Sequence, residues 1–245
     1  FLITYGVGLI GAAIALIVGQ LAYLVILGAI LVRQRISFIH QVSLNTLKNV
    51  LLGSFPYGIL TFLGLIYFKI DTILLAYLKG NFDAGIYTVG YRFLEISIIL
   101  PSALATVFFP FFAKWSKEIA KFYRRATFIL IALAFVTMVV FIFILPPILQ
   151  IFLPQYVDSL KVIRILALSL PFFFVNSLQS MLLLSKKDLL KKLIYISIFV
   201  IFINISLNIL FIPRYSYLAA SWVTLITEVF ISLVFFVLIR RFFKT

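Results

Sequence analysis

Long apolar segments separated by short polar connections run through the whole chain. A membrane-spanning helix needs about 20 predominantly apolar residues. Seven segments meet this requirement: residues 8–32, 49–78, 85–113, 126–146, 160–185, 193–212 and 217–239. Residues 1–4 are expected to be the end of a further helix. The pattern predicts an all-α protein that folds as a polytopic bundle of transmembrane helices.

The composition supports a membrane protein and excludes several chemistries. Hydrophobic residues make up 64% of the chain, charged residues 11%, and the mean hydropathy is +1.23, whereas a soluble domain has about 25% charged residues. The absence of Cys and the single His, His40, exclude disulfides, thiolate metal sites and most imidazole chemistry. A Gly-rich nucleotide-binding loop is also absent from the sequence. We therefore expect no cofactor and no metal.

The positive charges favour one orientation in the membrane. Fifteen Lys and Arg residues fall in alternate connections on one side of the predicted spans, and four fall on the other. Cytoplasmic loops carry the excess of basic residues, so we expect a cytoplasmic C-terminus and an external turn at residues 79–84. Because the net charge of +14 lies mostly in these short loops, we expect no nucleic-acid partner.

Four charged residues interrupt the second and third apolar segments: Lys69, Asp71, Arg92 and Glu95. A charge at the centre of a spanning helix costs about 2.5–3.5 kcal/mol on insertion scales, so it usually has a partner or a function. Counted from the turn near residue 81, Lys69 matches Glu95 in depth and Asp71 matches Arg92. Either pair, Lys69 with Glu95 or Asp71 with Arg92, can therefore meet between the two segments. Lys69 and Asp71 lie about 200° apart around a helix, so one of them must point elsewhere.

Further polar side chains lie inside the last three segments. We expect four amides to line a polar cavity: Asn176, Gln179, Asn204 and Asn208. Glu228 lies near the middle of its span without a basic residue in the adjacent turns, and is a candidate for exchanging a coupling proton. The alternative is a protonated, hydrogen-bonded packing residue.

Short connections argue against an enzyme, although a membrane-embedded glycan polymerase or ligase stays an alternative. Such an enzyme would gather acidic and basic residues on a sizeable outer loop. The longest outer connection, residues 147–160, carries only the charge of Asp158. Buried charges and short loops favour transport over catalysis.

Two stretches resemble a known family. Residues 67–75 (YFKIDTILL) and 85–95 (GIYTVGYRFLE), followed by Leu-Pro and Phe-Pro at 100–101 and 109–110, are similar to the seventh and eighth helices of O-antigen-type polysaccharide flippases. Residues 204–213 (NISLNILFIP) resemble the join between the last two helices of that family. These flippases belong to the multidrug/oligosaccharidyl-lipid/polysaccharide exporter superfamily. One departure is the usually Gly-rich turn before the last helix, which is Tyr-Ser-Tyr-Leu at residues 215–218 here.

The resemblance implies a fragment running from about the sixth to the twelfth helix, a MATE-like half plus one helix. Residues 1–32 would contain the last helix of an N-terminal bundle and the end of the helix before it. Residues 33–48 would form a cytoplasmic linker, and residues 49–245 a C-terminal six-helix bundle. The partner bundle would be the N-terminal part of the same chain.

The resemblance also implies a function: a flippase that moves a polyprenyl-pyrophosphate-linked oligosaccharide across the cytoplasmic membrane of a prokaryote for polysaccharide biosynthesis, coupled to H⁺ or Na⁺. Lys69 and Arg92 become candidates for phosphate binding, and Asp71 and Glu95 for positioning them or for ion coupling. Lys161 and Arg164, at the outer end of the fifth segment, would assist or would only anchor the helix at the interface. An ion-coupled small-molecule or drug antiporter of the same superfamily is the alternative.

Overall fold

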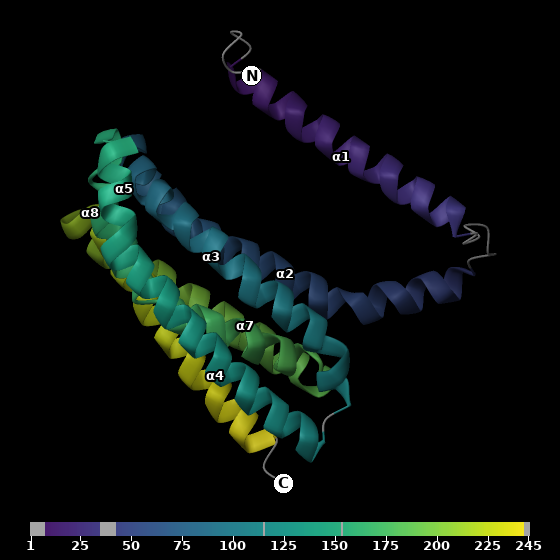
Figure 1. The fold of residues 1–245 in the computed structure, drawn as a ribbon. Helices are drawn as coiled ribbons and strands as arrows, with labels where there is room; N and C mark the ends of the chain where they lie inside the picture. Colours follow the sequence, from purple (N-terminus) through teal and green to yellow (C-terminus); the bar gives the residue numbers. More distant parts are fainter. Residues whose placement is uncertain (1–7, 35–42, 115, 153, 243–245) are drawn as a thin grey trace. The chain divides into compact units, whose positions relative to one another are not determined.

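The protein is helical almost throughout the parts that the computed structural model describes, residues 8–34, 43–114, 116–152 and 154–242 (Figure 1). The α-helices are α1 Gly8–Arg33, α2 Leu44–Lys79, α3 Asn81–Ala113, α4 Lys117–Val139, α5 Leu145–Phe152, α6 Ser159–Ala167, α7 Leu170–Leu184 and α8 Leu190–Phe242. Five helices are long and apolar enough to cross a membrane, and the bent pair formed by α6 and α7 is a sixth candidate span. The all-α polytopic bundle is therefore confirmed.

Three of the long helical stretches are interrupted, each for a local reason. The chain bends by 53° between α6 and α7, where Pro171 occupies the first turn of α7 and is suited to start a helix but not to continue one. Residues Val140–Ile144 form a π-helix just before Pro146 and Pro147. These two prolines lack the backbone N–H groups that would continue regular α-helical hydrogen bonding.

The third interruption lies within α8, at Ser216. Its backbone angles of φ 50° and ψ −133° are close to those of the first central residue of a type II′ turn, a position that favours Gly. The Ser216 hydroxyl donates to the Asp83 carboxylate near the start of α3. α8 therefore contains two helices joined by a sharp turn, which matches the separate spans predicted at 193–212 and 217–239.

The chain divides into two compact units, Phe1–Leu52 and Gly53–Thr245. The first contains α1 and the beginning of α2. The second contains the rest of α2 and all later helices. Half of the cytoplasmic linker expected at 33–48, residues 35–42 with His40, lies outside the described residues, as does the helix end expected at 1–4. The proposed domain boundaries stay a prediction.

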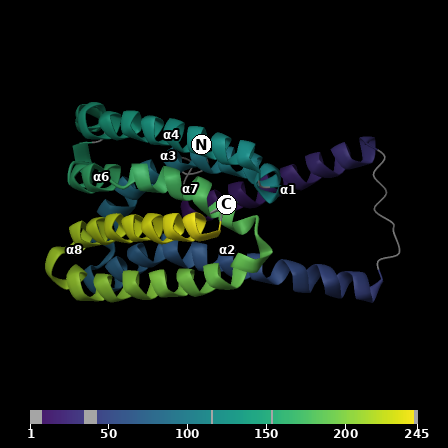
Figure 2. The same ribbon diagram turned by 90° about the horizontal axis from the view of Figure 1, so that it is seen from below.

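Within the second unit, α3 and α7 lie side by side and are flanked by α4, α6 and α8 (Figure 2). Large side chains are fully buried where these helices meet, among them Tyr87 and Phe112 of α3 and Phe174 and Leu178 of α7. The α2–α3 connection is a single non-helical residue, Gly80. Its φ of +90° is open to Gly without steric cost. This tight turn holds α2 and α3 antiparallel and brings their charged residues to similar depth.

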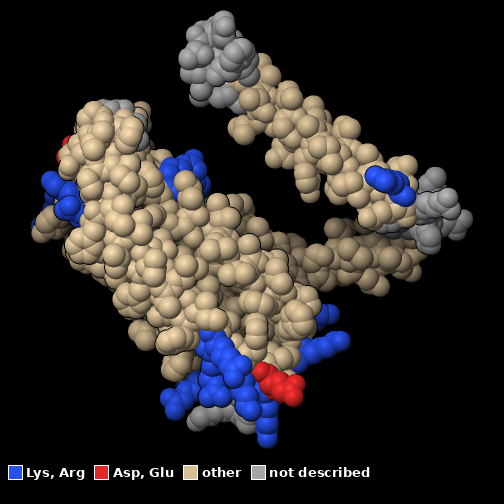
Figure 3. Space-filling view, in the orientation of Figure 1, with Lys and Arg blue, Asp and Glu red and all other residues tan. Residues whose placement is uncertain are grey.

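Basic residues gather at the end of the second unit where α8 terminates (Figure 3). The α3–α4 and α7–α8 connections share this end, because Lys186 Nζ donates to the Ala113 carbonyl over 3.2 Å. The arrangement agrees with the alternation of charge along the sequence. Which side of the membrane this end occupies stays a prediction.

Candidate functional site

One carboxylate joins two cations across α2 and α3. Lys69 Nζ lies 2.8 Å from Glu95 Oε1, and Arg92 Nη1 lies 2.7 Å from Glu95 Oε2. The Lys69–Glu95 pair is one of the two that matching depth allows. The Lys69 and Arg92 side chains are 53% and 65% exposed within the described structure, and Glu95 is 22% exposed. We call Lys69, Arg92 and Glu95 the charge cluster; it carries one net positive charge and its cations are open.

Of the two pairs that matching depth allows, Asp71–Arg92 does not form. Asp71 is 4% exposed and, among the described residues, forms no ion pair. Its carboxylate instead accepts hydrogen bonds from Tyr87 OH at 3.0 Å, Thr224 Oγ1 at 2.8 Å and Asn208 Nδ2 at 2.7 Å. The reason is helical geometry, because about 200° separates Asp71 from Lys69 on α2. Lys69 faces the open side with Glu95, so Asp71 faces α8.

The surroundings of Asp71 are rich in oxygen. Asn208 Nδ2 also donates to Asn204 Oδ1 over 3.0 Å, and Tyr87 OH lies 3.0 Å from Thr224 Oγ1. Within the described structure, two buried amide atoms of this group, Asn208 Oδ1 and Asn204 Nδ2, lack a hydrogen-bond partner. Leaving an ionised carboxylate buried without a cation is costly. The chemistry therefore suits an Asp71 that carries a proton or holds a small cation.

Glu228 forms a second buried carboxyl site. It is 2% exposed and accepts hydrogen bonds from Tyr67 OH and Asn176 Nδ2, both over 2.7 Å. Asn176 is itself held by Ser232, whose hydroxyl donates to Asn176 Oδ1 over 2.6 Å. As predicted, Glu228 has no basic partner among the described residues. Its hydrogen-bond partners are neutral hydroxyl and amide groups. These groups can bond to the carboxyl group whether it is protonated or ionised.

A cleft of about 370 Å³ reaches Glu228. Its walls come from α2, α3, α7 and α8, and its polar lining includes Ser102, Thr106, Asn176, Ser177 and Ser180. Ser102 and Thr106 follow Glu95 on α3 at spacings of seven and eleven residues, which place all three on one helix face. The cleft therefore continues the same side of α3 that carries the charge cluster.

Most of the other candidates lie apart from this cleft. Asn176 lines it, whereas Gln179, Asn204 and Asn208 are buried within the helix packing and do not appear among its lining residues. Lys161 and Arg164 are exposed on α6 and also lie outside its lining. Their opposite face, which includes Val162, Ile163 and Leu166, is buried.

Sequence reasoning assigned no role to the hydroxyl groups that surround the two buried carboxyls. Tyr67, Tyr87 and Thr227 take part in these networks, yet an apolar segment gives no sign that a Tyr will face a buried acid. Thr224 offered a partial signal, since it lies four residues before Glu228 and shares its helix face.

Comparison with known proteins gives one match. Residues 1–116 match a family model described as polysaccharide biosynthesis protein. No curated protein and no solved structure matches the chain. The matched residues include all of α1, α2 and α3, and with them Asp71 and the complete charge cluster. The resemblance inferred from the sequence is thus confirmed over residues 1–116, where this multi-pass membrane protein is similar to the polysaccharide biosynthesis protein family.

Proposed function

We propose that this chain is part of an ion-coupled transporter that flips a polyprenyl-pyrophosphate-linked oligosaccharide across the cytoplasmic membrane for polysaccharide biosynthesis. The observation that carries the proposal is the charge cluster on a membrane-spanning helix pair, inside the region that matches the polysaccharide biosynthesis family. Exposed cations within such a helix pair are costly in lipid and suit an anionic ligand.

The geometry of the cluster supports phosphate binding. Arg92 uses one nitrogen on Glu95, so the other guanidinium donors stay open for a second anion. Lys69 likewise has three donors and uses one on Glu95. Arg presents a planar fork that fits phosphate oxygens in pairs, whereas Lys acts as a point charge. In this proposal Glu95 holds the two cations together, and the pyrophosphate occupies their free donors.

The two buried carboxyls supply candidates for ion coupling. Glu228 borders the cleft, and Asp71 lies in the oxygen-rich site between α2, α3 and α8. A proton or Na⁺ taken up at either group would change the hydrogen bonds that join those helices. Transport would then be driven by the ion gradient, with the amides and hydroxyls holding each carboxyl in place.

Replacing Arg92 tests the substrate site. Arg92→Ala in the full-length protein should abolish glycan export with an unchanged protein level, because the side chain is exposed and its loss leaves no buried group unpaired. The readout is the lipid-linked glycan that accumulates on the inner leaflet. Arg92→Lys should retain part of the activity, since it keeps the charge but not the fork.

The matched control is Lys79→Ala, which removes one exposed cation from the same helix pair beside the Gly80 turn. Export should continue in this variant. Unchanged export in Arg92→Ala would remove Arg92 from the site. Accumulation of an unmodified small solute, with normal glycan export, would instead favour the small-molecule antiporter.

A further inference from the structure

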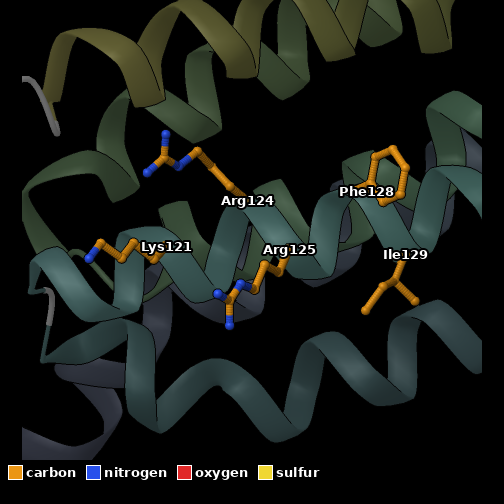
Figure 4. Close-up of a pocket in the computed structure, with 5 residues that line it drawn as sticks. All are labelled: Lys121, Arg124, Arg125, Phe128 and Ile129. Carbon is orange, nitrogen blue, oxygen red and sulfur yellow. The ribbon is translucent and has the colours of Figure 1, made fainter.

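The N-terminal half of α4 carries an open groove that the proposed transport site does not use. It has a volume of about 670 Å³ and is lined by Lys121, Arg124, Arg125, Phe128 and Ile129 (Figure 4). Arg124 and Phe128 point to one side of α4, and Arg125 and Ile129 point to the other. We call these five residues the α4 basic groove.

The α4 basic groove faces away from the helix packing. The buried residues of α4 in this region are Ala126, Leu130 and Ala134, which follow one another at four-residue spacing on one face. By the 100° step of an α-helix, Lys121 and Phe128 lie on the opposite face. No α4 residue lines the cleft that reaches Glu228. The α4 basic groove is therefore turned toward the surrounding membrane and is separate from the candidate transport site.

Its three cations have no acidic partner. Lys121, Arg124 and Arg125 are all exposed, and none forms an ion pair within the described residues. Glu118, one turn earlier on α4, is not paired with any of them either. Three cations within five residues repel one another unless an anion is bound between them. The end of the second unit at which α4 begins is strongly basic (Figures 1 and 3).

The α4 basic groove changes from charged to apolar along the helix axis. Phe128 and Ile129 are 73% and 63% exposed and lie one turn beyond Arg124 and Arg125. The distance from Lys121 to Ile129 along the axis is about 12 Å at 1.5 Å per residue. This change matches a lipid at the membrane interface, with phosphate at the level of the cations and acyl chains at the level of the two apolar side chains.

We propose that the α4 basic groove binds the headgroup of an anionic phospholipid from the surrounding bilayer. The phosphate lies among Lys121, Arg124 and Arg125, and the acyl chains pack along Phe128 and Ile129. A zwitterionic lipid fits the same shape less well, because its choline or ethanolamine group brings a positive charge to a site with three. The ligand is a bilayer lipid and not the transported glycan, since the groove faces away from the cleft.

Fluorescence quenching tests this site directly. The full-length protein carries Phe128→Trp as its reporter, with Trp115→Phe and Trp222→Phe to remove the two Trp residues of this sequence. It is reconstituted in phosphatidylcholine vesicles that contain either brominated phosphatidylglycerol or brominated phosphatidylcholine. We expect the phosphatidylglycerol to bind several-fold more tightly at this position because of the combined charge of the three cations. In the triple variant Lys121→Gln, Arg124→Gln and Arg125→Gln, the two brominated lipids should quench the reporter to nearly the same extent.

A second triple variant separates a site from general surface charge. This variant combines Lys187→Gln, Lys191→Gln and Arg240→Gln and also removes three exposed cations from the basic end. Lys187 lies in the α7–α8 connection, Lys191 in the first turn of α8 and Arg240 in its last turn. The preference at the reporter should survive this change. Equal quenching by both lipids in the parent protein, or an equal loss in both triple variants, would overturn the proposal. So would displacement of the brominated phosphatidylglycerol by an equimolar polyprenyl pyrophosphate, which would assign the groove to the substrate.

Discussion

The buried carboxylate of Asp71 should contribute to stability through its three hydrogen bonds. In Asp71→Ala, Tyr87, Thr224 and Asn208 lose an acceptor while staying buried. Each buried group left unpaired costs about 1–3 kcal/mol, and the partial replacement of Tyr87 and Thr224 bonds by each other limits the total to about 2–4 kcal/mol. Thermal unfolding in detergent measures the change.

Asp188→Ala is the control for that measurement, because Asp188 is exposed in the α7–α8 connection. A surface substitution of this kind should change the free energy of unfolding by less than about 0.5 kcal/mol. If both variants unfold at the same temperature as the parent protein, Asp71 does not organise the helix packing around it.

Glu228 is expected to act in ion coupling, and this can be separated from packing. Glu228→Gln keeps the size of the side chain but removes the exchangeable proton. Its amide oxygen can accept from Asn176, and its amide nitrogen can donate to the Tyr67 hydroxyl in place of the bond that Glu228 accepts from it. Under the proposed function, the rate of glycan export should lose its dependence on pH. Tyr67→Phe removes one donor and should shift the profile without flattening it. Parallel profiles for the parent and both variants would leave Glu228 with a structural role only.

The sequence indicates how deep a charged residue lies in the membrane better than it indicates the direction in which the side chain points. Matching depth across the Gly80 turn predicts Lys69 opposite Glu95, because both residues belong to adjacent antiparallel helices. The same rule fails for Asp71, since depth says nothing about direction around the helix axis. The partners Thr224 and Asn208 are 153 and 137 residues away in the chain. A contact of that range depends on tertiary packing that no local pattern reveals.

Among the helices, the close approach of α3 and α6 depends on Gly90. A Cβ atom at this position would lie 2.5 Å from Val162 Cγ1 and 2.9 Å from Val162 Cβ on α6. Gly90→Ala should therefore force α3 and α6 apart and destabilise the protein by about 1–3 kcal/mol. A lowered unfolding temperature, measured in the same detergent, is the expected result.

Gly85→Ala is the matched control on the same helix. No atom lies within 4 Å of a Cβ placed at Gly85, so the substitution should be neutral, or stabilising by up to about 1 kcal/mol through helix propensity. A similar effect of both substitutions would mean that α3 and α6 do not approach each other as described.

The apolar segments predicted the helices well and their ends less well. The segment predicted at 126–146 belongs to a continuous helical stretch from Lys117 to Phe152, because its first turns are basic on one face and apolar on the other. A search for continuous apolar segments does not detect amphipathic helical turns of this kind. The break between α6 and α7 has a local signal in Pro171, whereas the π-helix at Val140–Ile144 has no signal apart from the prolines that follow. Ser216 adopts its turn without the Gly that the family resemblance led us to expect.

At the scale of the molecule, the distribution of charge predicts the orientation, and two introduced thiols test it. These 245 residues contain no Cys, so a thiol-specific label can report on one position at a time. Phe82 is exposed beside the α2–α3 turn, and Asp188 is exposed in the α7–α8 connection. The basic connections belong in the cytoplasm. In intact cells a membrane-impermeant thiol reagent should therefore label Phe82→Cys and leave Asp188→Cys unmodified until the cells are permeabilised.

The reverse labelling pattern would mean that the whole bundle has the opposite orientation in the membrane. It would also move the α4 basic groove to the outer leaflet, because the α3–α4 and α7–α8 connections share one end of the second unit. Lys69 and Arg92 lie nearer to Gly80 than to the other ends of α2 and α3, so the charge cluster would then fall in the cytoplasmic half of the membrane. A phosphate-bearing substrate is first met on that side and is released on the other. The labelling result therefore decides which step of transport Lys69 and Arg92 can serve, independently of whether Arg92→Ala blocks export.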